Sequence, residues 1–186
     1  MVSNHRKNMD ENALLAACLT GNQNAQRMFF DHFSSTMMGI ALRYMKDEQL
    51  ANDVLQETFI KAFESLHKFK KEGSLEGWLK KITVNTALDH LRKEKKFQFN
   101  SEINDSSNEL SYKQNALTKL QADDLMSIIQ SLPDGYRTVF NLYAIEGYSH
   151  KEIADQLEIT ESTSKSQYSR AKTLLRNILE KHGIER

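Results

Sequence analysis

The stretch SHKEIADQLEIT, residues 149–160, decides how the C-terminal part of this chain folds. Ser149 and Glu152 have the spacing of a capping box, in which the serine hydroxyl accepts from the glutamate amide and the carboxylate reaches back. The short helix that follows places Ala154 on its apolar side, where two helices that cross near a tight turn need a small side chain. After a short turn, Thr160 can cap a second and longer helix. This order of elements is typical of the DNA-binding helix-turn-helix.

The longer helix of this pair carries hydrogen-bond donors on its expected exposed face. Hydroxyl, ammonium and guanidinium groups suit phosphates and base edges, and arginine can bind guanine through two hydrogen bonds. A helical hairpin with a solvated outer face is the other interpretation of the same pattern. The donors that we predict to bind duplex DNA are Ser162, Thr163, Lys165, Ser166, Ser169 and Arg170.

Apolar residues recur at helical spacing over most of the chain, and its 186 residues include a single proline, Pro133. Long helices are therefore expected. Between the periodic segments lies a polar, acidic stretch rich in asparagine and serine, which is typical of a linker. We predict an all-α fold with two small helical domains: a four-helix domain over residues 8–97, a linker over residues 98–121 and a second domain over residues 122–182.

Positive charge is concentrated in one segment, although the net charge of the whole chain is zero. Residues 68–97 hold nine Lys and Arg against four Asp and Glu, whereas residues 98–124 hold two against five. Clustered charge governs nucleic-acid binding more than the total does. A run of charges can also be a solvated face and nothing more, so the cluster alone leaves both interpretations open.

The fourth predicted helix, which Ser74 can cap, carries an unusual line of side chains. Its members follow at spacings of four, three, four and three residues, so they share one face. In one interpretation the apolar start is core and the acid pairs with a cation along the helix. In the other, this face and the basic loop before it bind single-stranded nucleic acid, which offers phosphates to lysines and unstacked bases to aromatic and amide groups. The line is Trp78, Ile82, Asn85, Asp89 and Arg92.

Other functional classes find little support in the sequence. It has no Gly-rich phosphate loop, no recognisable pairing of nucleophile and base, and no histidine spacing suited to a metal. We therefore expect no enzyme, no cofactor and no metal site. No stretch approaches the roughly 20 apolar residues of a membrane span, and the first ten residues lack an apolar signal core. Cys18 is interpreted as a small core residue of a cytoplasmic protein.

Several stretches resemble extracytoplasmic-function sigma factors, a subgroup of the sigma-70 family of bacterial RNA polymerase subunits. Residues 73–93, GSLEGWLKKITVNTALDHLRK, are similar to the family region that reads the downstream promoter element. Residues 53–62, DVLQETFIKA, are similar to its polymerase-binding helix. SLP at residues 131–133 and SKSQYSRAK at residues 164–172 resemble its C-terminal domain. The likeness covers both predicted domains, in the family's order.

The resemblance implies roles for individual residues. It places Asp53, Gln56 and Glu57 against the coiled coil of the polymerase's largest subunit, whereas the residues alone indicate only a solvated acidic helix face. It places the C-terminal donors on the duplex −35 element. A further set faces the melted −10 element, and the loop that begins this set is expected to pocket a flipped base. That set is Phe69, Lys70, Lys71, Lys80, Asn85, Asp89, Arg92 and Lys93.

By this resemblance the chain is a promoter-specific sigma factor, with core RNA polymerase and promoter DNA as partners. An anti-sigma factor is expected to hold it inactive, and the free chain is expected to be monomeric, without membrane insertion. The other candidate is a transcription factor that binds duplex DNA alone, with its N-terminal domain used for dimerisation or ligand sensing; it would bind a palindrome as a dimer. A helical protein used only for interactions would not need the recognition helix.

The helix-turn-helix departs from the family pattern at three positions. Glu158 stands at the turn position usually held by glycine, where a positive φ costs roughly 1 kcal/mol. Ser164 stands where an apolar residue usually packs, and Gln167 stands where arginine is common. We therefore expect a weak or unusual preference for the −35 element.

Overall fold

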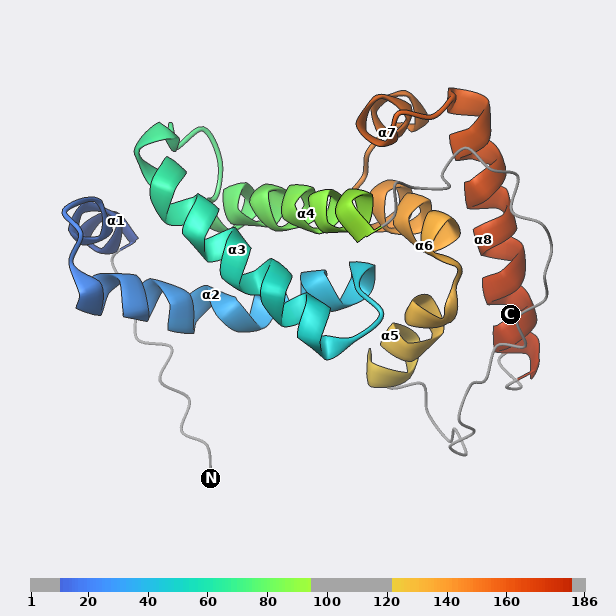
Figure 1. Cartoon of the computed structure of the whole chain (residues 1–186), viewed down its shortest axis with the longest axis horizontal. Helices are drawn as coiled ribbons and strands as arrows, with labels where there is room; N and C mark the ends of the chain where they lie inside the picture. The colour runs from blue at the N-terminus through green and yellow to red at the C-terminus, as the bar shows by residue number, and fades with distance from the viewer. Residues whose placement is uncertain (1–10, 95–121, 182–186) are drawn as a thin grey trace. The chain divides into compact units, whose positions relative to one another are not determined.

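The computed structural model describes residues 11–94 and 122–181. Over these ranges it holds eight α-helices and two short turns of other helical types, without a strand, and the predicted all-α class is confirmed. Figure 1 shows the helices in chain order from blue to red. The predicted linker, residues 98–121, lies outside the described residues.

The chain divides into two units that each draw on separate stretches of sequence. The first unit takes residues 1–41 and 49–87, and the second takes residues 42–48 and 88–186. The last turn of α2 and the last turns of α4 therefore belong with the C-terminal helices. The N-terminal helices are α1 (Glu11–Leu19), α2 (Gln23–Tyr44), α3 (Glu48–Ser65), the 3-10 turn η1 (Leu66–Lys68) and α4 (Leu75–Glu94).

Local sequence signals set where the helices of the first unit begin and end. Gly21 has a positive φ of 76°, and its amide donates to the Cys18 carbonyl at 3.0 Å, which closes α1. Glycine adopts this left-handed backbone without a Cβ clash. The Asn22 side chain then caps α2 by accepting from the Ala25 amide at 3.1 Å. Ser74 Oγ accepts from the Gly77 amide at 3.0 Å, so the predicted cap of α4 is confirmed.

Aromatic side chains from α2 and α3 form the centre of the first unit's core. Phe29 is fully buried, and its ring centroid lies 4.9 Å from that of Phe33, 6.1 Å from that of Phe59 and 5.5 Å from that of Phe63. Tilted and edge-on pairs of this kind add about 0.5–1.5 kcal/mol each beyond area burial. From α4, the buried Thr83 donates to the Leu79 carbonyl at 3.0 Å, which satisfies its hydroxyl inside the helix.

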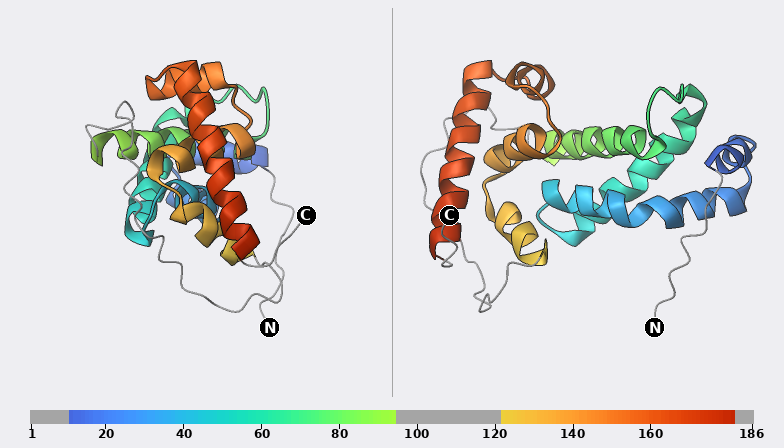
Figure 2. Two further views of the ribbon diagram at one scale, coloured as in Figure 1. Left: turned by 90° about the vertical axis from the view of Figure 1, so that its right-hand side faces the viewer. Right: turned by 180° about the vertical axis from the view of Figure 1, so that it is seen from behind.

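The second unit is organised along one long helix, α8, against which α6 and α7 pack (Figure 2). Pro133 separates the first two helices, as predicted, because it has no amide to continue the hydrogen-bond ladder. Leu132, Tyr136 and Ala171 are buried together, with Phe140, Leu174 and Leu175 packed around them. The elements are α5 (Ala122–Ser131), α6 (Asp134–Phe140), the π-turn η2 (Asn141–Ile145), α7 (His150–Leu157) and α8 (Glu161–Lys181).

None of the helices in the described part of the chain is both long enough and apolar enough to cross a membrane.

Candidate nucleic-acid interface

The predicted capping box at the start of α7 is present. Ser149 Oγ accepts from the Glu152 amide at 3.3 Å, and Glu152 Oε2 accepts from the Ser149 amide at 2.8 Å. Glu152 Oε2 also accepts from the Ser149 hydroxyl at 2.7 Å. The backbone and side-chain hydrogen bonds from Ser149 hold the pKa of Glu152 below its usual value. The capping box therefore fixes the point at which the helix-turn-helix begins.

The turn between α7 and α8 has the left-handed backbone that the family's usual glycine would favour. Glu158 has φ 56° and ψ 40°, and the next amide, of Ile159, donates to the Ala154 carbonyl at 3.1 Å. Thr160 then caps α8 by accepting from the Thr163 amide at 3.0 Å, as predicted. The turn keeps its geometry although a residue with a Cβ occupies the strained position.

The other two departures from the family pattern lie on the buried side of α8. Ser164 is fully buried, and its hydroxyl lies 2.9 Å from Nδ1 of His150, so the polar group has a partner. Gln167 is also buried, and its amide packs against the backbone of Gly135, where a Cβ would lie 3.4 Å from Gln167 Oε1. His150 on α7 thus compensates for Ser164. Gln167 finds room beside Gly135 on α6, but its buried Oε1 has no hydrogen-bond partner among the described residues.

An aromatic cluster lies beside this interface. The rings of Tyr143 and His150 stack, with their centroids 4.2 Å apart and an interplanar angle of 13°. The ring centroid of Tyr168 lies 4.5 Å from that of Tyr143. Burial, and then the positive charge of Lys165, lower the pKa of His150. The imidazole is therefore mostly neutral at pH 7 and adds little positive charge beside α8. Sequence reasoning missed the cluster because its three rings come from three different elements.

The predicted donor face of α8 is exposed, except that Thr163 is half-buried. Lys165 pairs with Glu161 at 2.7 Å, and Arg170 Nη1 donates to the Tyr136 hydroxyl at 3.3 Å. The Lys165–Glu161 pair is exposed, so solvent screens it strongly. Lys165 can therefore exchange this contact for an anionic ligand at small cost.

The basic loop before α4 is built around a pair of aromatic rings in the first unit. Phe69 and Trp78 are both half-buried, with ring centroids 5.4 Å apart. Lys71 has a positive φ of 59°, which is uncommon for a residue with a side chain. Its Nζ donates to Asn12 Oδ1 at 2.7 Å, so the loop is tied to α1. Lys70, between Phe69 and Lys71 in the sequence, is exposed.

The line of side chains from Trp78 to Arg92 on α4 agrees only partly with the expectation of an apolar core at its start and an ion pair at its end. Trp78 and Ile82 are half-buried and are not among the core residues of α4, which are Leu75, Leu79, Thr83, Val84, Thr86, Ala87, Leu88 and Leu91. Asn85 is exposed, and Lys80 pairs with Glu76 at 2.7 Å. In the second unit's part of α4, Arg92 Nη1 lies 2.9 Å from Asp89 Oδ1, as the ion-pair interpretation predicts, and Lys93 is exposed.

The acidic face of α3 also carries an apolar side chain. Asp53 and Gln56 are exposed, while Glu57 is half-buried and pairs with Lys61 at 2.9 Å. The apolar side chain is Ile60, which is 58% exposed. It follows Asp53 by seven residues and Gln56 by four, so it shares the acidic face and not the buried one.

Two family models match the chain in the order of its two groups of helices. Sigma-70 region 2 matches residues 29–97, and Sigma-70 region 4 matches residues 122–175. The chain belongs to the sigma-70 family, in its extracytoplasmic-function subgroup. Sigma factors are transcription initiation factors and not enzymes, so the expectation of a non-enzymatic protein is confirmed.

Individual sigma factors are similar over most of this sigma factor's length. RNA polymerase sigma-H factor of Pseudomonas aeruginosa is 27% identical over 86% of this chain and 89% of its own length. SigV of Bacillus subtilis is 29% identical over 96% of this chain and 99% of its own. Among solved structures, the sigma factor RpoE of Bartonella quintana, in complex with the anti-sigma factor NepR, aligns with a TM-score of 0.51. The identity to that structure is 21% over 83% of this chain and 96% of that chain, so it supports the fold.

The left-handed turn predicts that Glu158→Gly stabilises the protein. Glycine removes the Cβ clash at φ 56°, so we expect the free energy of unfolding to rise by about 0.5–1 kcal/mol, as measured by urea denaturation. The matched control is Glu158→Ala, which shortens the side chain but keeps the Cβ and should bring no such gain. An equal gain from both variants would show that the backbone is not strained.

The capping box predicts a pH-dependent effect of Ser149→Ala. At pH 7 this variant should lose about 1 kcal/mol of stability, because one amide of α7 loses its acceptor. The folded-state pKa of Glu152 is depressed, so its stabilising contribution is present above the unfolded-state pKa of about 4.3 and is lost as pH falls through the lower folded-state value.

The difference between wild type and Ser149→Ala should therefore shrink below about pH 4. Urea denaturation across the pH range measures it, with the exposed α8 substitution Thr173→Ala as the control. That control should change stability by less than about 0.5 kcal/mol at every pH. A wild-type advantage over Ser149→Ala that is the same at pH 3 and pH 7 would contradict the role of the carboxylate.

Proposed function

We propose that this sigma factor binds core RNA polymerase through the exposed face of α3. The observation that carries the proposal is the composition of that face, where Asp53, Gln56 and Glu57 share one side of α3 with the exposed Ile60. An exposed apolar side chain with polar groups beside it offers both kinds of contact that protein interfaces use. The resemblance of residues 53–62 to the family's polymerase-binding helix supplies the partner.

We further propose that the loop and polar face of α4 bind the −10 element as a melted strand. The half-buried pair of Phe69 and Trp78 offers ring surface for an unstacked base. Asn85 adds an exposed amide for base edges, and the surrounding lysines attract the phosphates. The full set remains the predicted one: Phe69, Lys70, Lys71, Lys80, Asn85, Asp89, Arg92 and Lys93.

We assign the −35 element, as duplex DNA, to the exposed face of α8. A short α7, a left-handed turn and a long α8 match the arrangement in which the second helix enters the major groove. The proposed contacts are Ser162, Thr163, Lys165, Ser166, Ser169 and Arg170. The buried Ser164 and Gln167 lie on the opposite side of α8, so the contacts to DNA would come from its exposed residues.

The proposed division of labour is that residues 8–97 bind polymerase and the −10 strand while residues 122–182 hold the −35 duplex. The stretch between them, residues 98–121, would thread toward the polymerase active site. We infer that the free protein is a cytoplasmic monomer controlled by an anti-sigma factor. The similarity to RpoE of Bartonella quintana, whose structure contains an anti-sigma factor, supports that inference.

The polymerase assignment predicts that Asp53→Arg/Glu57→Arg loses binding to core RNA polymerase. Reversing two charges on one helix face places arginines against groups that accept carboxylates, which costs several kcal/mol in like-charge contacts. We expect the apparent affinity for purified core enzyme to fall by at least about 100-fold, or about 2.8 kcal/mol, measured by fluorescence anisotropy of labelled sigma factor.

The control for that measurement is Asp155→Arg/Glu180→Arg, which makes the same change in net charge at exposed positions of α7 and α8. It should bind core polymerase within about threefold of wild type. Equal losses in the two double variants would show a non-specific charge effect, and unimpaired binding by the α3 variant would overturn the assignment.

The −35 assignment predicts that Lys165→Ala/Arg170→Ala loses discrimination of the −35 element. Wild-type holoenzyme should bind a promoter with an intact −35 element better than one with that element scrambled, and the variant should reduce the ratio by about tenfold or more. The reason is that base-edge contacts carry discrimination, whereas the −10 contacts are unchanged. Filter binding at fixed salt measures the ratio.

Arg176→Ala/Lys181→Ala is a matched control for this variant. These two cations lie eleven residues further along α8, on the same faces and roughly 16 Å away. Their removal should weaken both promoters equally or not at all. Wild-type discrimination by the Lys165/Arg170 variant would contradict the assigned contacts.

A further inference from the structure

The loop between η1 and α4, residues 69–74, is held at both of its ends within the first unit. At its start, the Phe69 amide donates to the carbonyl of the buried Leu66 at 3.1 Å. At its end, the Ser74 side chain caps α4. The middle of the loop, residues 70–73, is exposed and belongs to no helix, so its shape depends on contacts made by its side chains.

A side chain of α1 contacts the middle of this loop. Lys71 Nζ donates to Asn12 Oδ1 at 2.7 Å, although the two residues are 59 positions apart in the sequence. Asn12 is exposed in the first turn of α1, and the buried side of that helix is formed by Leu14, Leu15 and Cys18. Since α1 also packs against η1, one helix contacts both the start and the middle of the loop. We call the hydrogen bond between Lys71 and Asn12 the loop tether.

The backbone of Lys71 has a conformation that a free loop would leave. Its φ of 59° lies in the left-handed region, which residues with a Cβ adopt at a cost. Strain of this kind persists only where the surrounding structure holds it in place. The loop tether supplies such a hold, because it fixes the far end of the strained residue's own side chain.

The two adjacent lysines of the loop therefore have different surroundings. Lys70 is exposed and can turn its ammonium group toward a phosphate, whereas the ammonium group of Lys71 is engaged by Asn12. An exposed hydrogen bond is easily exchanged for another partner. For Lys71, however, the exchange would also release its left-handed backbone and with it the shape of the loop.

The loop tether lies next to the aromatic pair of the surface assigned to the −10 strand. Phe69 precedes Lys71 by two residues, and its ring centroid lies 5.4 Å from that of Trp78. Contacts to base edges and ring faces need a fixed geometry, whereas contacts to phosphates carry no sequence information. A loop that leaves its bound shape for part of the time therefore loses preference for the correct base before it loses attraction to the strand.

We propose that Asn12 is a positioning residue for base recognition. Through Lys71 it holds the loop of residues 69–74 in the shape that receives an unstacked base of the −10 element. In this account Lys71 acts inside the protein, and Lys70 is the lysine that contacts the strand. The proposal rests on the assigned −10 surface and deepens it, because it separates a residue that shapes the loop from one that binds DNA.

The first measurement tests the loop tether in the free protein. Trp78 is the single tryptophan of the chain and contacts the loop through Phe69, so its fluorescence reports on the loop without DNA. Asn12→Ala and Lys71→Met each remove the tether, and both should raise the quenching of this fluorescence by acrylamide. Lys70→Met is the matched control, since it removes the same charge at the neighbouring exposed position, and it should quench like wild type.

Asn12→Asp is the conservative variant of the tether. Its carboxylate keeps an acceptor for the Lys71 ammonium group and stands near the start of α1, where a negative charge is favourable. It should therefore quench like wild type. All four substitutions are at exposed positions, so the fold should be retained, and circular dichroism checks it.

The second measurement uses holoenzyme formed from core polymerase and each variant. The probes are fluorescent single-stranded oligonucleotides with the −10 sequence of a promoter that wild-type holoenzyme selects from random DNA. Each of the four bases is placed in turn at the position of strongest preference. Asn12→Ala and Lys71→Met should reduce the preference for the selected base by about fivefold or more, which is the loss of about one base contact. Asn12→Asp should retain that preference.

Lys70→Met should act differently on the same probes. It should weaken binding of all four oligonucleotides alike and reduce the steepness of the salt dependence by about 0.7, as expected for one lost phosphate contact on a single strand. Lys71→Met should leave the salt dependence unchanged, because its ammonium group is used within the protein.

Unchanged quenching in both tether variants would overturn the loop tether, whatever the DNA result. Increased quenching with wild-type base preference would overturn the positioning role. A Lys71→Met variant that loses salt dependence as Lys70→Met does, with its base preference intact, would also overturn it and make Lys71 a phosphate contact. Wild-type affinity and salt dependence in Lys70→Met would instead contradict the assignment of this loop to DNA, which the quenching measurement does not involve.

Discussion

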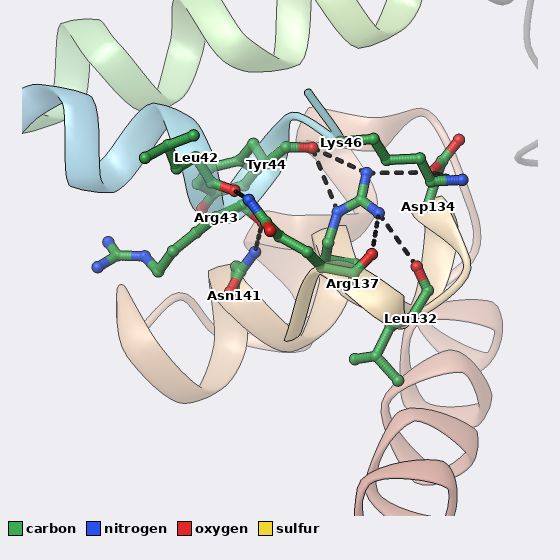
Figure 3. A network of polar contacts seen from close by, with 9 residues as sticks. Leu42, Arg43, Tyr44, Lys46, Leu132, Asp134, Arg137 and Asn141 are labelled. Atoms are coloured by element: carbon green, nitrogen blue, oxygen red, sulfur yellow. Dashed lines mark hydrogen bonds and ion pairs between the residues drawn. The ribbon is translucent and has the colours of Figure 1, made fainter. Parts of the chain in front are cut away.

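The guanidinium of Arg137 is the group on which the second unit depends. A charge with 1% exposure is tolerated only when its donors are paired, because an isolated buried ion loses its hydration without compensation. Here five N–H groups meet the carbonyls of Tyr44, Leu132 and Gln130 and the carboxylate of Asp134 (Figure 3). Burial lowers the pKa of Arg137 to about 10, so it remains charged at neutral pH. A lysine, with one ammonium group, could not span these acceptors.

This one side chain connects several features that are separate in the sequence. It holds the end of α5 across the break at Pro133, and it fixes α6, against which α8 packs. The helix-turn-helix then needs only local devices: the capping box at Ser149, the left-handed turn at Glu158 and the cap at Thr160. The helix α8 is thus positioned by a buried polar network on one side and by short-range caps on the other.

Signals that act over a few residues were readable from the sequence. The capping box, the caps at Ser74 and Thr160, the break at Pro133 and the strained turn at Glu158 depend only on neighbours in the chain, and all are present. The proposed contacts with polymerase and DNA remain predictions, since they involve molecules outside this chain.

What the sequence could not indicate was contact between distant segments. Arg137 donates to the carbonyl of Tyr44, 93 positions earlier. Every residue has a backbone carbonyl, so the sequence does not show which one is the acceptor. Ile60 is apolar, yet it lies on the exposed face of α3, because the buried stripe runs through Val54, Leu55, Phe59 and Ala62. Likewise Trp78 packs against Phe69 outside the core. The sequence did not indicate this contact, because Phe69 lies in a loop that has no periodic pattern.

The central claim is that this chain confers promoter recognition and melting on a polymerase that lacks both. The most direct test is permanganate footprinting of DNA fragments selected by core polymerase together with this protein. The account predicts unpaired, reactive thymines at the −10 element when both proteins are present, and none with either protein alone. Fragments that the chain protects by itself as symmetrical duplex sites, with no reactive thymines after polymerase is added, would contradict it and indicate a transcription factor that acts without melting.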